Sequence, residues 1–88
     1  MRKVKSHIRN RLRQYRNITG LSQKEVAQIL GFRSATRISQ WESGFKKPSI
    51  DNLLKLSFLY STLPAQLYPE LWQDIILKLK EKKLKARN

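Results

Sequence analysis

The chain has 88 residues, of which 19 are Lys or Arg and 6 are Asp or Glu, so its net charge at pH 7 is +13. This length fits one small domain, and the lack of cysteine excludes a disulfide framework and a cysteine-based metal site. No apolar run approaches the roughly 18 residues of a membrane-spanning helix, so we expect a cytoplasmic protein. So positive a charge favours a polyanionic partner, of which nucleic acid is the commonest.

A basic arm and a first helix are predicted at the start of the chain. The arm spans residues 1–7 and carries Arg2, Lys3 and Lys5. The helix follows because Ile8, Leu12 and Tyr15 recur at helical spacing, which puts them on one inward-facing side.

The start of a second helix, over residues 22–30, is marked by Ser22. Ser22 and Glu25 have the spacing of a capping box, in which each side chain accepts a hydrogen bond from the other residue's backbone amide. Val26 and Leu30 then supply an apolar face, and Gly31 ends the helix.

A third helix is predicted over residues 35–43, with Ser34 as its N-cap. Ile38 and Trp41 lie three residues apart and define its buried side. Two short helices joined by a tight turn that contains Gly31 form a helix-turn-helix, which in most settings reads DNA.

Two more helices are predicted after a loop at residues 44–48. Ser49 caps the fourth helix, and Asp51 favours its first turn. The buried face of the fourth helix consists of Leu53, Leu56 and Tyr60. Residues 62–68 predict a short fifth helix with Pro64 in its first turn.

The composition changes in the C-terminal part, residues 69–88, where acidic residues come first and lysines last. That order suits the helix dipole. Four apolar residues share one side at helical spacing: Trp72, Ile75, Ile76 and Leu79. We predict an amphipathic helix over residues 70–84. Its apolar face needs a cover, which is either the chain's own core near the first or fifth helix or a second copy; we favour the second copy.

These motifs resemble those of the helix-turn-helix family of phage Cro and lambda-type repressors, also called the xenobiotic-response-element family. The resemblance covers residues 8–68. It rests on residues that follow the family's order: Gln23, Ala27, Gly31, Ile38, Trp41, Glu42, Ser43, Gly44, Lys47, Pro48 and Ser49. It implies an all-α fold, with a five-helix repressor-like domain followed here by the added amphipathic helix.

Further features follow from the comparison with the family pattern. The resemblance implies that Arg16 pairs with Glu42 and ties the first helix to the third. The chain departs from the pattern between Gly31 and Ile38, which are seven steps apart where the family has six, so the turn holds an extra residue. Ser61 stands where the family often has a glycine closing the fourth helix.

Helical geometry indicates which side chains of the third helix face away from the core. At about 100° per residue, Thr36 and Gln40 point nearly opposite the buried side. The resemblance also places residues 35–40 at the reading surface. Amide, guanidinium and methyl groups can recognise base edges in the major groove. The predicted base-reading residues are Arg33, Thr36, Arg37, Ser39 and Gln40.

Four residues are predicted to contact phosphates, namely Gln23, Ser43, Lys46 and Lys47. Gln23 would lie at the amino end of the second helix, where free amides attract anions. A structural role at this position is an equal alternative. The other three follow from the resemblance, and for the two lysines simple solubility is the alternative.

The residues needed for catalysis or metal binding are scarce. His7 is the single histidine and lies in the basic arm. The chain therefore lacks the histidines that a histidine metal site or a catalytic triad requires. There is no glycine-rich phosphate loop. We therefore expect neither an enzyme nor a cofactor nor a metal.

Motif and charge together predict sequence-specific binding of double-stranded DNA by a repressor-like transcriptional regulator of a bacterium, phage or mobile element. The resemblance implies a homodimer on two half-sites. One alternative is an antitoxin or adaptor-type protein-interaction module that uses residues 70–84. Another is membrane-surface binding through the basic tail, which we disfavour, so no membrane partner is predicted.

Overall fold

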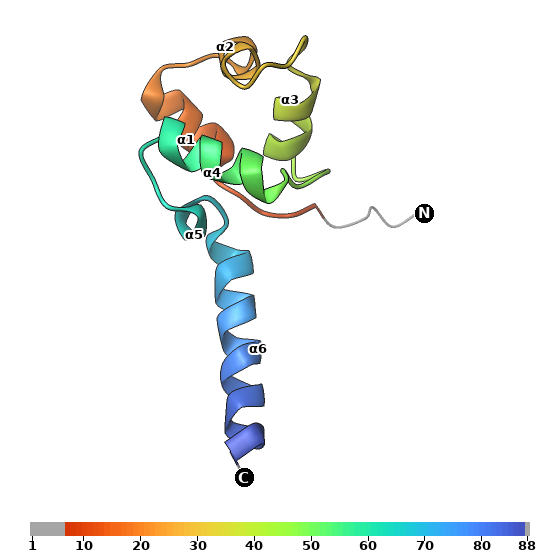
Figure 1. The fold of residues 1–88 in the computed structure, drawn as a ribbon, viewed down its shortest axis with the longest axis vertical. Helices are drawn as coiled ribbons and strands as arrows, with labels where there is room; N and C mark the ends of the chain where they lie inside the picture. The colour runs from red at the N-terminus through yellow and green to blue at the C-terminus, as the bar shows by residue number, and fades with distance from the viewer. Residues whose placement is uncertain (1–6, 88) are drawn as a thin grey trace, which may run out of the picture.

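The computed structural model of the protein describes residues 7–87, which form six helices and no strand (Figure 1). The helices are α1 (Leu12–Thr19), α2 (Gln23–Ile29), α3 (Thr36–Glu42), α4 (Ile50–Leu59), α5 (Pro64–Leu67) and α6 (Pro69–Arg87). This confirms the predicted all-α fold of a five-helix domain with an added C-terminal helix. Arg2, Lys3 and Lys5 of the predicted basic arm lie outside the described residues.

Helix α1 begins later than the apolar spacing predicts. Ile8 lies in a non-helical segment before the helix, where its amide donates to the carbonyl oxygen of Gly44 at 3.0 Å. The helix starts at Leu12, whose amide donates to Asn10 Oδ1 at 3.0 Å. The placement of Ile8 on the first helix is therefore wrong, because the Asn10 side chain and Gly44 offer the backbone other partners. Leu12 and Tyr15 do face the core.

Helix α2 has the predicted ends. The amide of Glu25 donates to Ser22 Oγ at 3.0 Å, and the amide of Ser22 donates to Glu25 Oε1 at 2.8 Å, so the capping box is confirmed. Gly31 follows the helix with a φ of +86°, a conformation that favours glycine. The amide of Phe32 then reaches back to the carbonyl of Ala27 at 2.8 Å, which closes the helix as a Schellman motif.

Helix α3 differs from the prediction at its start. Ala35, and not Ser34, occupies the N-cap position, and no side chain caps the helix. Ser34 Oγ lies 3.4 Å from the amide of Thr36, close to the limit for a hydrogen bond. The longer turn accounts for the shift, because it leaves Ser34 one residue too far from the helix. Ile38 and Trp41 are buried as predicted, so the register of the helix faces is confirmed.

Helix α4 begins as predicted and ends under strain. Ser49 Oγ accepts a hydrogen bond from the amide of Asn52 at 3.2 Å. At the other end Ser61 has a φ of +53° and occupies the position that glycine takes in a Schellman motif. The amide of Thr62 donates to the carbonyl of Ser57 at 3.0 Å and completes that motif.

The core lies where α1 to α5 meet and contains most of the predicted apolar positions. Its buried members are Leu12, Val26, Ala27, Ile38, Trp41, Leu56, Tyr60, Leu67 and Tyr68. Leu53, predicted to be buried, packs against this cluster and is half-buried. Phe32 meets Trp41 edge to face, with 5.8 Å between ring centroids.

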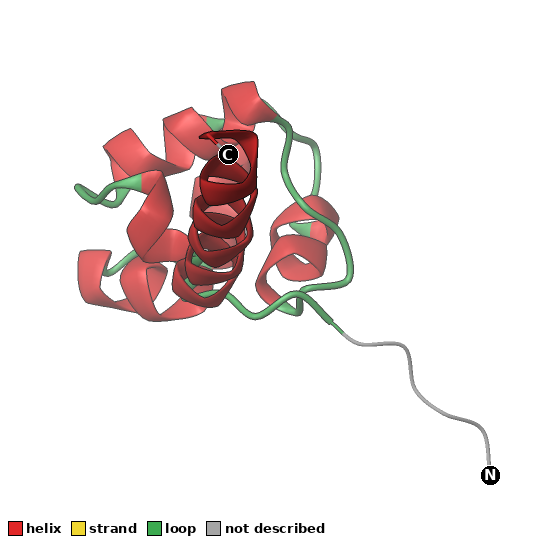
Figure 2. Cartoon of the chain, turned by 90° about the horizontal axis from the view of Figure 1, so that it is seen from below, coloured by secondary structure: helices red, strands yellow, loops and turns green. Residues whose placement is uncertain are grey.

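Helix α6 projects from the domain formed by α1 to α5 (Figure 1), and Figure 2 looks nearly along its axis. It has 19 residues and none of them is buried. Trp72 is 47% exposed and Leu79 is 58% exposed. Leu71, at the base, packs against the core. The chain's own core therefore covers only the base of the apolar face.

Replacing Ser61 by glycine should stabilise the protein, because a non-glycine residue in the left-handed region carries a conformational cost. We expect Ser61→Gly to raise the free energy of unfolding by about 0.5–1 kcal/mol, measured by urea denaturation. Ser43→Gly is the matched control, because Ser43 has a φ of −76° at the end of α3. Equal gains from both changes would contradict the explanation.

Candidate nucleic-acid interface

The predicted base-reading residues lie on the outer side of the helix-turn-helix. Arg33, in the turn, and Thr36, Arg37 and Ser39, on α3, are exposed. Gln40 is half-buried at the end of the same helix. The buried Ile38 and Trp41 anchor the opposite side of α3 in the core. The structure therefore leaves all five predicted residues at least partly accessible on the surface of α3 and the turn before it.

Arg37 is positioned by an aromatic ring within this surface. Its guanidinium carbon lies 4.7 Å from the centroid of the Phe32 ring. Phe32 in turn packs against Trp41, so the ring is fixed by the core. Stacking uses the face of a guanidinium and leaves its in-plane N–H donors available for a base or a phosphate.

The end of α3 is organised by main-chain groups around Gln40. Its carbonyl oxygen accepts hydrogen bonds from the amides of Phe45 at 3.0 Å and Lys46 at 3.3 Å. Ser43 Oγ donates to the same oxygen at 3.1 Å. Lys46 and Lys47 follow in the exposed loop. The predicted phosphate-contacting residues Ser43, Lys46 and Lys47 thus lie at or just after the end of α3.

Gln23 is held inside the domain and not free at the surface. Its side-chain nitrogen donates to Glu42 Oε1 at 2.9 Å, and the residue is half-buried. Gln23 is still the first residue of α2. This bond matches the structural alternative for Gln23, since the amide joins the start of α2 to the end of α3.

The carboxylate of Glu42 is the centre of the network that holds the three helices together. Its side chain is only 1% exposed. Arg16 Nε donates to Glu42 Oε2 at 2.5 Å, and Arg16 Nη2 donates to Oε1 at 3.1 Å. Arg13 adds a third contact at 3.3 Å. The pair expected between Arg16 and Glu42 is therefore present, and it links α1 to α3.

The surroundings of Glu42 determine its ionisation. Burial alone would raise the pKa of the carboxyl group, but the hydrogen bonds from Arg16 and Gln23 and the charge of Arg16 outweigh burial and lower the pKa. The hydrogen bond to Glu42 raises the pKa of Arg16 in return, against the effect of burial. Both groups therefore stay charged in the folded protein.

Asn10 is a positioning residue that the sequence interpretation missed. Its Nδ2 donates to the carbonyl oxygens of Ile8 and Trp41, each at 3.0 Å. Its Oδ1 accepts from the amide of Leu12. An asparagine just before a helix is a cap signal, but the bond to α3 spans 31 positions and has no local signature.

Gly44 lets the segment before α1 lie against the end of α3. Its φ is +81°, and a Cβ atom there would lie 2.4 Å from the carbonyl oxygen of Ile8. That contact is too short for any side chain, so only glycine fits. The segment from His7 to Asn10 is therefore held beside the end of α3.

The described residues contain neither a cluster of metal-binding side chains nor a helix suited to span a bilayer. Among residues 7–87, no three His, Asp or Glu side chains are grouped to hold a metal ion. No helix in that range is long and apolar enough to cross a bilayer.

Comparison with known families gives one match. A family model described as helix-turn-helix matches residues 12–58, more than half of the chain. The matched range runs from the start of α1 nearly to the end of α4 and contains the network around Glu42. Comparisons with curated proteins and with solved structures gave no match.

Removing the charge of Glu42 should destabilise the fold in a pH-dependent way. Because its pKa is lowered on folding, its contribution is present above the pKa of an unfolded Glu, about 4.3, and is lost as the pH falls through the folded-state pKa. We expect Glu42→Gln to lower the free energy of unfolding by about 3 kcal/mol at pH 7, because Arg16 loses its partner.

Urea denaturation followed by circular dichroism between pH 7 and pH 3 would measure this difference. The difference in free energy of unfolding between Glu42→Gln and the unchanged protein should narrow as the pH falls below about 4. Glu81→Gln, on the exposed part of α6, is the matched control and should have almost no effect. A difference that stays constant with pH would show that the carboxylate charge is not the stabilising feature.

Proposed function

The chain belongs to the helix-turn-helix family of DNA-binding proteins, and on that premise we propose that it binds double-stranded DNA sequence-specifically as a repressor-like transcriptional regulator. The genome it regulates would be that of a bacterium, a phage or a mobile element. In the proposed complex α3 enters the major groove and α2 lies across the phosphate backbone. No catalytic step is involved, and the protein would act in the cytoplasm, where such DNA lies.

The exposed polar side of α3 carries this proposal. Its donors and acceptors suit base edges: the Gln40 amide can bridge adenine N6 and N7, and Arg33 can form two bonds to guanine. The methyl group of Thr36 can contact the methyl group of thymine. Because Ile38 and Trp41 fix the back of the helix, these groups are presented without reorganisation of the core.

Electrostatic attraction would supply much of the affinity. The net charge of +13 attracts the phosphate backbone. Ser43, Lys46 and Lys47 are exposed at and just after the end of α3, and we propose that they contact a phosphate beside the groove. Phosphate contacts position a protein on the duplex, whereas base contacts select the sequence. The proposal therefore assigns different roles to the loop and to α3.

We also propose that two copies bind together as a homodimer. A two-fold dimer would place its two reading helices about 34 Å apart on one side of the duplex, one helical turn of DNA. Support comes from the uncovered apolar face of α6, since a dimer would remove that face from water.

Selection of bound sequences from random duplex DNA would test the function directly. On the selected site we expect Gln40→Ala or Thr36→Ala to cost about 1–3 kcal/mol of binding free energy and to relax the preference at individual base pairs. Binding to unrelated DNA should hardly change. Gln73→Ala, at an exposed position of α6, is the matched control. Uniform weakening on all sequences would contradict the assignment of α3 to the major groove.

The salt dependence of binding would test the phosphate contacts. Affinity should fall on the order of 10³-fold or more between about 50 and 200 mM salt. Lys46→Ala and Lys47→Ala should each weaken binding to all sequences and reduce the slope of log affinity against log salt by about one. Deleting residues 1–6 should also reduce this slope if the basic arm contacts the phosphates.

The matched control for the salt measurement is Lys47→Arg, which keeps the charge and should keep the slope. If Lys47→Ala left the slope unchanged, the lysine would serve solubility and would not bind phosphate.

A further inference from the structure

The apolar side of α6 is left largely uncovered by the domain. Trp72, Ile75 and Leu79 are 47%, 43% and 58% exposed, and they share one side of a helix that has no buried residue. Covering this side with a partner would be favourable, because burial of apolar area drives association.

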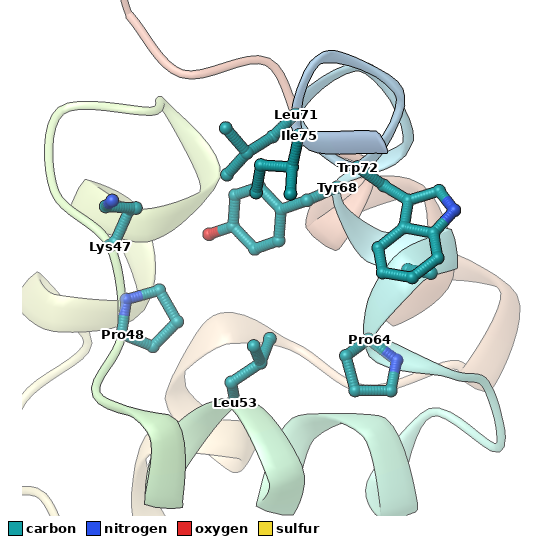
Figure 3. Close-up of a pocket in the computed structure, with 9 residues that line it drawn as sticks. Lys47, Pro48, Leu53, Pro64, Tyr68, Leu71, Trp72 and Ile75 are labelled. Atoms are coloured by element: carbon teal, nitrogen blue, oxygen red, sulfur yellow. The ribbon is translucent and has the colours of Figure 1, made fainter. Parts of the chain in front are cut away.

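This apolar side continues into a groove at the base of α6 (Figure 3). The groove has a volume of about 210 Å³, and its walls come from α4, α5, α6 and the loop before α4. Leu53, Pro64, Trp72 and Ile75 line it, together with Tyr68, whose buried hydroxyl has no hydrogen-bond partner among the described residues. The surface available to a partner is thus a groove that opens onto a helix face.

We propose that the partner is a second copy of this chain, and that the two α6 helices pair antiparallel. The inference rests on the proposed homodimer and specifies how it is built. The midpoint between Ile75 and Ile76 is also the midpoint between Trp72 and Leu79. A two-fold axis at that point therefore sets Trp72 of one copy opposite Leu79 of the other, so that each apolar residue meets an apolar residue.

The lysines of α6 decide the direction of the pairing. Lys82 and Lys83 flank the apolar side one turn beyond Leu79. A parallel pair would therefore bring each lysine against the same lysine of the other copy. In the antiparallel pair the two Lys82 residues lie about 20 Å apart along the helices, at 1.5 Å per residue. This separation is about twice the Debye length of about 8–10 Å, so their repulsion is largely screened.

The same geometry agrees with binding to two half-sites. Because Pro69 lies as far from the axis as Lys82, the two domains are attached about 20 Å apart at opposite ends of the paired segment 69–82, and residues 83–87 of each α6 extend past Pro69 of the other copy. Leu79 of each copy lies beside Trp72, at the edge of the other copy's groove. Neither α3 takes part in the pairing, so both reading helices remain free.

Single cysteines would test the arrangement, because the natural chain contains none. Under mild oxidation Ile76→Cys should form a disulfide-linked dimer, since its two copies lie beside the axis within the roughly 7 Å between Cα atoms that a disulfide allows. Trp72→Cys and Leu79→Cys should not link to themselves but should link to each other when mixed. Leu77→Cys, on the opposite side of α6, is the matched control and should stay unlinked.

A second variant pair measures the dimer without crosslinking. Leu79→Lys should raise the dimer dissociation constant in sedimentation experiments by about 100-fold or more, because one apolar contact is lost from each copy. Leu77→Lys should leave it within a few-fold. Both positions lie on a helix without buried residues, so the domain should fold in either variant.

Several outcomes would overturn the proposal. A chain that stays monomeric, or self-linking of Leu79→Cys, excludes the antiparallel pair. A dimer that survives Leu79→Lys but is lost with Phe58→Ser would place the interface on α4, where Phe58 is 87% exposed. If crosslinking fails while the protein still selects a DNA sequence, the pairing is wrong and the proposed function stands. If crosslinks form but no sequence is selected, the pairing stands and the proposed function is wrong.

Discussion

The charged contact between Glu42 and Arg16 is the constraint on which the domain depends. A carboxylate that is only 1% exposed stays ionised because Arg16, Arg13 and Gln23 supply hydrogen bonds from two other helices. Such a pair adds little net stability compared with apolar residues of the same volume, but losing one partner leaves a buried charge alone. The network therefore fixes how α1, α2 and α3 are oriented more than how stable the domain is.

Orientation matters because α2 and α3 are too short to be stable by themselves. Helices α2 and α3 have seven residues each, well below the length at which an isolated helix is stable in water. Their positions come from the core and from the contacts that Asn10 and Gly44 make at the end of α3. The inner side of α3 is thereby fixed, and its outer side is free to carry whichever polar groups a DNA site requires.

Helix α6 differs from the other helices because most of it projects from the domain. The family match ends before it, and of its apolar residues only Leu71, at its base, packs against the core. Its other apolar residues are therefore free to serve a contact outside the domain. Pairing of two such helices would join the DNA-reading domains without touching the surfaces that read, which separates affinity through dimerisation from sequence recognition.

Local signals in the sequence determined most of the helices and buried sides and the caps of α2 and α4: the capping box at Ser22, the turn at Gly31 and the apolar spacing of the core all act within one or two helical turns. Resemblance to a known family added the Arg16 pair. Tertiary structure alone decided that Ile8 leaves the first helix, that Gln23 binds Glu42 and that α6 stands clear of the domain. The reason is physical, because each of these outcomes depends on partners that are distant in sequence, and helical periodicity carries no information about them.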